Sequence, residues 1–299
     1  MDRGDAPARG EAQPVAGLLS STPPLPDGWV HRSPTRFWVE GVQRDSSRRW
    51  WQALWVLTRH EFATRYRAQA LGVVWSLLQP IVMMGIMSVI FTRVFPSGEL
   101  NYPIFVLIGV LLWQLVGAAT MAATNTFVAH SEIIKRTIFP RMLLPMAVML
   151  SHGLNFLMAS TMLFVFVPIF PSAFKLSPAL LLIPVILFFL LLLLTGVSLA
   201  VSVLNVLYRD VAYLVETLLL IVYWLTPVIY HIELIPEPYQ TALKCNPLTG
   251  IFNALRGCIM KGTPPTLLMW ASVVIPTLVI FVSGWLIYRH YERMVLDHV

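Results

Sequence analysis

Six long apolar segments constrain the fold of this chain more than any other feature of its sequence. Each is close to the length that an α-helix needs to cross the hydrocarbon core of a bilayer, about 20 residues. A helix is favoured inside lipid because it pairs its own backbone N–H and C=O groups. The sequence therefore predicts an all-α membrane protein with six transmembrane helices, at Leu71–Phe91, Ile104–Ala122, Leu143–Val167, Leu180–Leu204, Tyr213–Tyr230 and Leu267–Tyr288.

The composition agrees with a membrane protein. Of the 299 residues, 57% are hydrophobic and only 12% are charged, whereas soluble domains average about 25% charged residues. The net charge of +6 does not indicate a nucleic-acid-binding surface, because ten of the basic residues precede the first apolar segment. Basic residues beside a membrane segment typically hold it on the cytoplasmic side, so no nucleic-acid partner is expected.

The positions of Lys and Arg predict the orientation of the chain. If the N-terminus is cytoplasmic, sixteen of the 21 basic residues lie in cytoplasmic segments, and the short connection 96–103 carries none. External segments then hold Lys175, Lys244, Arg256 and Lys261, with Arg93 at the end of a span. Because cytoplasmic loops are enriched in basic residues, both termini of this multi-pass protein are expected in the cytoplasm.

The region before the first span divides into a tail and a helix. Residues 1–46 hold six prolines and no long apolar run, which predicts a disordered cytoplasmic tail. The stretch 47–64 is amphipathic, and tryptophans next to arginines are typical of a helix in the membrane interface. The alternative is an ordinary cytosolic helix packed on protein. The residues assigned to the interface helix are Arg48, Arg49, Trp50, Trp51 and Trp55.

Two connections between spans are themselves predicted to be helical. Residues 131–138 form a short, charged, amphipathic stretch that is ended by Pro140. The connection 231–266 is too apolar for a plain loop, and five of its residues repeat at helical spacing: Leu248, Ile251, Phe252, Leu255 and Ile259. This pattern predicts a helical hairpin that dips back into the membrane, or lies at its surface, from the outside.

The spans themselves contain few interruptions. The fourth is apolar almost all round and is expected to face mainly lipid, and Pro80 and Pro184 are expected to lie inside spans. His152 and Asn155 share one face of the third span, where interhelical hydrogen bonding is favoured over a proton relay. Arg209, Asp210 and Glu216 are polar residues within or next to the membrane. Carboxylates in this position, here Asp210 and Glu216, are candidates for function. A structural ion pair near the interface is the alternative.

The sequence lacks the motifs of several enzyme classes. It contains no GxxxxGK[ST] loop for nucleotide phosphates, and no HExxH, GxSxG or DxD. Cys245 and Cys258 lie in one external segment, where either a disulfide or two free thiols would fit. No Cys/His cluster predicts a metal site. We therefore expect neither a catalytic residue nor a cofactor in this chain, which points to transport rather than catalysis.

Aromatic residues near the span ends are candidates for a substrate path. Most such residues anchor helices at the membrane interface, and this interpretation is preferred for Trp270 and Trp285. Tyr223, Trp224 and Tyr230 adjoin the Thr226-Pro227 break, where aromatic faces could line a path for sugar rings. The candidates for a channel lining are Trp75, Trp113, Tyr223, Trp224 and Tyr230.

Several motifs together resemble one family. They are YRAQALGVVWSLLQP at the first span, HSEIIKRTIFPRMLLP after the second, NVLYRDV before the fifth, YWLTPVIY in the fifth and NPLTGIF in the external segment. In this order they resemble the membrane subunit of polysaccharide-exporting, type-2 ABC transporters, which move O-antigen, teichoic acid, galactan or capsule-like glycans. The resemblance covers about residues 47–299.

The resemblance implies a mechanism and a set of partners. Two copies of the chain would pair, in the bacterial inner membrane, with two copies of a separate ATPase that binds ATP and Mg. A glycan on polyprenyl diphosphate would leave between the two copies. Pro236–Gly257 would be an external gating hairpin, and the coupling helix that contacts the ATPase would contain Ser131, Glu132, Ile134, Lys135, Arg136 and Ile138.

Three other functions are compatible with the sequence. A type-2 ABC exporter of drugs or lipids would share the six spans. A membrane enzyme that modifies lipid-linked glycan would need an acid or a base at the interface. A scaffold subunit would have no conduction path and no partner ATPase.

Overall fold

The structure of this chain is a computed structural model that describes residues 46–67, 73–91, 101–136, 140–292 and 294–295. The chain divides into two compact units, Met1–Arg49 and Trp50–Val299, and every contact below lies within the second. The tail predicted at 1–46 falls outside the described residues except for its last one.

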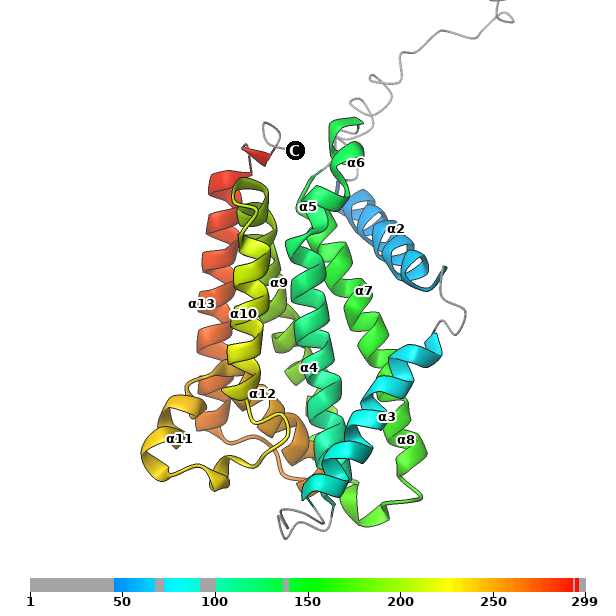
Figure 1. The fold of residues 1–299 in the computed structure, drawn as a ribbon, viewed down its shortest axis with the longest axis vertical. Helices are drawn as coiled ribbons and strands as arrows, with labels where there is room; N and C mark the ends of the chain where they lie inside the picture. The colour runs from blue at the N-terminus through cyan, green and yellow to red at the C-terminus, as the bar shows by residue number, and fades with distance from the viewer. Residues whose placement is uncertain (1–45, 68–72, 92–100, 137–139, 293, 296–299) are drawn as a thin grey trace, which may run out of the picture. The chain divides into compact units, whose positions relative to one another are not determined.

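The described residues form helices and no strand, which confirms the all-α class (Figure 1). The long helices are α2 (Ser46–Arg67), α3 (Val73–Val89), α4 (Tyr102–Thr124), α7 (Leu143–Ser160), α9 (Ile183–Leu207), α10 (Val211–Trp224) and α13 (Leu267–Tyr291). Shorter helices are α5 (Thr126–Ala129), α6 (Ser131–Arg136), α8 (Met162–Phe166), α11 (Glu237–Lys244) and α12 (Pro247–Arg256). Single turns occur at Pro171–Ala173, Pro178–Leu182, Ile232–Leu234 and Gly257–Lys261.

Four of the six predicted spans are helices that are long and apolar enough to cross a membrane: Tyr102–Thr124, Leu143–Phe166, Pro178–Leu207 and Leu267–Tyr291. The first and fifth give shorter apolar helices, Ser76–Val89 and Val211–Trp224. The fifth ends at Trp224 rather than at the predicted Tyr230. Pro227 disfavours helical backbone at the residue before it and has no N–H to donate.

Helix α9 lies at the centre of the bundle, in contact with α4, α7 and α13. Ten of its 25 residues are buried and three, Pro184, Val185 and Phe188, are exposed, so one face of the helix packs on protein. That the rest of this segment faces lipid stays a prediction. Its inward face carries small and polar residues, including Ser198, Ser202 and Asn205, all buried. The overall apolarity of the segment hid this small-residue face, which is the kind of surface that lets helices pack closely in a membrane.

Two glycines set the contact between α9 and α13. A Cβ added to Gly196 would lie 2.5 Å from Phe281 Cα and 2.8 Å from the Ile280 carbonyl oxygen. A Cβ on Gly284 would overlap the backbone of Gly196 itself. Only glycine therefore allows the two backbones to approach at this point.

One of the two prolines predicted inside spans lies there, and the other begins a helix. Pro80 lies inside α3, as predicted. Pro184 instead occupies the first turn of α9, where a helix needs no N–H donor. Pro276 lies inside α13, where neighbouring helices tolerate the interruption.

Different short helices lie at the two ends of the helical bundle. Helices α5 and α6 lie at the same end as the last turns of α13, and α11 and α12 lie at the opposite end (Figure 1). At that opposite end, the five apolar residues predicted to share a helical face are all buried in the core: Leu248, Ile251, Phe252, Leu255 and Ile259.

The glycine contact gives a test of the packing. Gly196→Ala should lower the stability of the folded protein by about 1–3 kcal/mol, the usual cost of inserting a methyl group into a close-packed core. Gly117→Ala is the matched control, because its Cβ would meet no atom closer than 3.9 Å. The thermal midpoint of the purified protein in detergent measures both, and equal midpoints for the two variants would contradict this packing.

Candidate functional site: an exposed short helix and an aromatic groove

Helix α6 is held by one side chain and exposes others. Ile134 is 4% exposed and belongs to a buried cluster with Phe127, Leu144, Tyr288 and Val295. Glu132 and Lys135 are exposed and Ser131 is half-buried. The helix therefore fixes its apolar side to α7, α9 and α13 and presents charges outward, as the amphipathic pattern predicted.

Two of the six residues predicted for this helix lie beyond what the structure describes. The side chain of Arg136 and the whole of Ile138 are outside the described residues. Their assignment to a coupling helix stays a prediction.

The break before α5 is fastened to the central helix. The Asn205 side chain on α9 donates to the Thr124 carbonyl oxygen at 3.0 Å and to Asn125 Oδ1 at 3.3 Å. An amide that satisfies a helix end in this way holds its orientation. Because α5 and α6 follow directly, the break ties the position of the short helix to α9.

Helix α2 confirms the predicted helix at 47–64 and extends it to Arg67. Leu54, 2% exposed, packs against Leu143 and Ala147 of α7. Trp51 and Trp55 are 63% and 58% exposed, and Trp50 is half-buried. Leu54 therefore packs on protein, whereas the two tryptophans are exposed. The side chains of Arg48 and Arg49 lie outside the described set.

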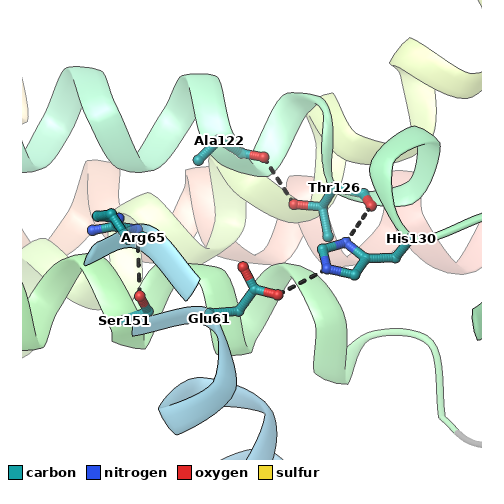
Figure 2. Close-up of polar contacts among 6 residues, drawn as sticks. All are labelled: Glu61, Arg65, Ala122, Thr126, His130 and Ser151. Carbon is teal, nitrogen blue, oxygen red and sulfur yellow. Dashed lines mark hydrogen bonds and ion pairs between the residues drawn. The ribbon is translucent and has the colours of Figure 1, made fainter. Parts of the chain in front are cut away.

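An ion pair joins α2 to the segment before α6 (Figure 2). His130 Nε2 lies 2.8 Å from Glu61 Oε1, and Nδ1 lies 2.9 Å from the Thr126 carbonyl oxygen. When the Glu61 carboxyl is ionised both partners accept hydrogen bonds, and the imidazolium form, which carries hydrogen on both ring nitrogens, satisfies them. The hydrogen bond with Glu61 raises the pKa of His130, and the same bond lowers the pKa of the Glu61 carboxyl despite burial.

The end of α2 makes further polar contacts with α7. Arg65 donates to Ser151 Oγ at 3.3 Å (Figure 2), and the Tyr66 hydroxyl donates to Asn155 Oδ1. His152 is buried, at 7% exposed, on the same helix. The predicted interhelical hydrogen bonding is thus confirmed for Asn155. Sequence reasoning missed Glu61, His130 and Arg65, whose partners are more than 65 residues away along the chain.

A groove of about 500 Å³ opens between α3, α4 and α10. Trp113 and Tyr223 meet there edge to face, with ring centroids 5.2 Å apart. Two amide side chains, Gln79 and Gln114, add hydrogen-bonding groups to a lining that is otherwise apolar: Leu78, Val82, Met83, Ile86, Val110 and Val228. Flat aromatic faces beside amides can hold a ring that is apolar on its faces and polar at its edge.

The groove contains two of the five predicted aromatic candidates. Trp224 contacts Tyr223 at 5.5 Å but is 61% exposed and is not part of the lining. The Tyr230 hydroxyl donates to the Trp224 carbonyl oxygen at 2.7 Å, so it supports the chain after α10. The Trp75 side chain is not described. Glutamines inside apolar segments were the signal that could have identified Gln79 and Gln114.

The remaining polar predictions are placed at the surface. Arg209, Asp210 and Glu216 are exposed, and within the described part of the chain none of them forms a salt bridge. Glu216 lies on α10, where its neighbours Leu214, Leu218 and Leu220 are exposed as well. Cys245 is exposed and Cys258 buried, and both are free thiols.

Comparisons with known proteins agree on one group. A sequence model of the ABC-2 type transporter family matches residues 52–260. An O-antigen export system permease protein RfbA of Klebsiella pneumoniae is 30% identical over 213 residues, which is 70% of this chain and 80% of that protein. The RfbA protein of Myxococcus xanthus is 24% identical over 213 residues, again 70% and 80%. The polysialic acid transport protein KpsM of Escherichia coli is 23% identical over 248 residues, 79% and 92%.

These relatives are permeases or transport proteins rather than enzymes. Together with four membrane-length helices, they place the chain in the class of multi-pass membrane transport subunits. The chain belongs to the ABC-2 type transporter family, whose model covers more than half of it. In this family the membrane subunit works with an ATP-binding subunit.

The Glu61–His130 pair predicts a pH dependence. The contribution of His130 to stability is complete below its ordinary pKa of 6.5 and is lost as the pH rises through its raised value. The contribution of Glu61 is complete above 4.5 and is lost as the pH falls through its lowered value. An ion pair of this kind contributes about 1 kcal/mol, so the thermal midpoint should fall by about 2–4 °C between mildly acidic and alkaline pH.

Glu61→Gln should remove most of this dependence, because the neutral amide does not favour the imidazolium form. His290→Gln, which removes an exposed histidine at the end of α13, is the control and should keep it. Thermal midpoints of the three proteins across the pH range decide the matter, and parallel curves would show that the pair does not contribute.

Proposed function

We propose that this chain is the permease subunit of an ATP-driven exporter that moves a polysaccharide, carried on polyprenyl diphosphate, outward across the bacterial inner membrane. The observation that carries the proposal is the groove in which Trp113 and Tyr223 meet beside two glutamines. The functions of the relatives, O-antigen export and polysialic acid transport, support a glycan as the substrate.

The chemistry of the groove suits a sugar chain. A pyranose ring has an apolar face that stacks on an aromatic ring and hydroxyl groups at its edge that need hydrogen-bond partners. Gln79 and Gln114 provide donors and acceptors on α3 and α4. Because none of the ten lining residues is charged, each sugar would be held weakly, as a polymer that must slide requires.

The energy source is proposed to be a separate ATPase that binds ATP and Mg. The printed sequence contains no P-loop, and α6 exposes Glu132 and Lys135 while Ile134 fixes it to the bundle. A motor that closes on nucleotide transmits force only through a contact that is rigid on the permease side. We assign residues 131–138 to this contact.

Two copies of the chain would enclose the path. Val82 and Ile86 of the groove are about half exposed, at 49% and 50%, and α10 presents Leu214, Leu218 and Leu220 outward. A second copy would cover these surfaces and close the groove. In this arrangement α3 and α10 complete six spans, both termini are cytoplasmic, α2 lies at the interface, and α11 and α12 form the external gating hairpin.

A second candidate, export of a lipid or a drug, is favoured by the apolar part of the lining. Six of the ten groove residues are aliphatic or methionine, which would suit an acyl chain as well as the isoprenoid part of a glycan carrier. The two candidates differ in whether the sugar itself is recognised.

Charge reversal on the coupling helix tests the motor contact. Glu132→Lys or Arg136→Glu should reduce glycan-stimulated ATP hydrolysis and export severalfold, because a reversed charge would no longer complement the group that it meets on the ATPase. Glu237→Lys, on exposed α11 at the other end, is the control. Hydrolysis and export are measured on the assembled complex, and unchanged values in both reversal variants would refute the assignment.

Aromatic truncation tests the substrate class. Trp113→Ala should raise the concentration of polyprenyl-linked glycan that gives half-maximal stimulation by about 2- to 10-fold, the equivalent of one aromatic contact. Phe188→Ala, which removes an exposed aromatic ring from α9, is the control. If the variant responds normally to glycan but poorly to amphiphiles without sugar, the lipid or drug candidate is correct.

A further inference from the structure

The buried arginine at the end of α12 makes an unusual set of contacts. Arg256 is 5% exposed. Its Nη1 donates to the Pro227 carbonyl oxygen at 2.6 Å, and its Nη2 donates to the carbonyl oxygens of Val228 at 2.6 Å and Phe105 at 3.0 Å. The guanidinium also lies over the Phe105 ring, 3.5 Å from its centroid. From sequence this residue was only one of the external basic charges.

These contacts bring three separate parts of the chain together. Arg256 belongs to α12, Phe105 to the first turn of α4, and Pro227 and Val228 to the break after α10. The planar guanidinium carries five donors in a fixed fork, so it can hold carbonyl groups that face it from different directions. A buried charge is stable only when such hydrogen bonds replace its hydration.

The surroundings are shaped to admit this side chain. A Cβ added to Gly109 would overlap both Arg256 Nη2 and the Val228 carbonyl oxygen. Two further hydrogen bonds tie the same segments: the Tyr102 hydroxyl donates to the Ile229 carbonyl oxygen at 2.6 Å, and Asn246 Nδ2 donates to Thr226 Oγ1 at 3.0 Å. The break after α10 is therefore held from α4 and from the α11–α12 hairpin at once.

The same break forms part of the groove. Val228, whose carbonyl oxygen accepts from Arg256, lines the groove together with Tyr223. Val228 also donates its backbone N–H to the Thr226 carbonyl oxygen at 2.7 Å, which closes a tight turn. A displacement of α12 would therefore act on the groove wall through two bonds of the arginine.

We infer that Arg256 is a positioning residue that fastens the α11–α12 hairpin to the wall of the groove, so that hairpin and wall move as one body. The fastening itself follows from the contacts. Only its consequence for export, that a loosened hairpin uncouples ATP hydrolysis from transport, rests on the proposed function.

The two cysteines of the chain provide a direct probe. Cys258 is fully buried two residues after Arg256, and Cys245 is exposed. In the permease–ATPase complex carrying Cys245→Ser, the rate of maleimide labelling reports exposure of Cys258. Adding Arg256→Gln should raise this rate at least about tenfold, the factor expected from losing one charge-assisted hydrogen bond.

Matched variants separate the fastening from general loss of structure. Arg256→Lys keeps the charge but not the fork, and should give intermediate labelling. Gly109→Ala should reproduce the effect of Arg256→Gln, whereas Gly85→Ala, whose Cβ would meet no atom within 4 Å, should have none. Lys261→Gln, which removes an exposed charge shortly after the hairpin, should also leave labelling unchanged.

Export measured on the same complexes completes the test. Fast labelling with ATP hydrolysis retained and glycan export lost supports the inference, because a folding defect would lower both activities together. Labelling of Cys258 that stays slow in both Arg256→Gln and Gly109→Ala overturns it. If Arg256→Gln fails to assemble, Arg256→Lys and Gly109→Ala decide by the same criterion. Labelling requires neither glycan nor nucleotide, so absence of export in the parent complex would refute the proposed function and leave the fastening standing.

Discussion

The close approach of α9 and α13 at Gly196 and Gly284 is the contact on which the other elements depend. Lipid chains are as apolar as leucine, so the hydrophobic effect does little to bring helices together inside a bilayer. Packing of backbones without intervening side chains provides the attraction instead. Because α9 also contacts α4 and α7, the position of the central helix decides where the groove and both ends of the bundle lie.

Polar contacts are concentrated where the helices end. At the α6 end, Asn205 holds the break after α4, Glu61 pairs with His130, and Arg141 donates to the Glu292 carbonyl oxygen at 3.0 Å. At the opposite end Arg256 holds the break after α10. Broken helices leave backbone groups without partners, and each break here receives a side chain from another helix.

The sequence predicted the helical class, the approximate segments and the short helix before Pro140, because these depend on local apolar periodicity. It placed Tyr230 inside a span, although Pro227 ends the helix before that residue. It did not identify the face of α9 that packs on α13, because hydropathy averages over all faces of a helix and cannot show which small residues meet another backbone. It did not predict that Trp113 contacts Tyr223, because the two rings meet only in the tertiary fold. The role of Arg256 was missed for the same reason. No local pattern around a single arginine in an external segment predicts hydrogen bonds to three carbonyl groups from distant parts of the chain.

Helix α4 links the features that would have to act together in a transporter. Its first two turns supply Phe105 and Gly109 to the arginine contact, its middle supplies Trp113 and Gln114 to the groove, and its end at Asn125 leads through α5 into α6. Ten of its first eleven residues are buried, so it cannot move there without displacing its neighbours. A force applied at α6 would therefore reach the groove through a helix that is packed on its sides and held at both ends. Since the hairpin is fastened to the same helix by Arg256, the outer end of the path would respond to the motor through this one element rather than through separate loops.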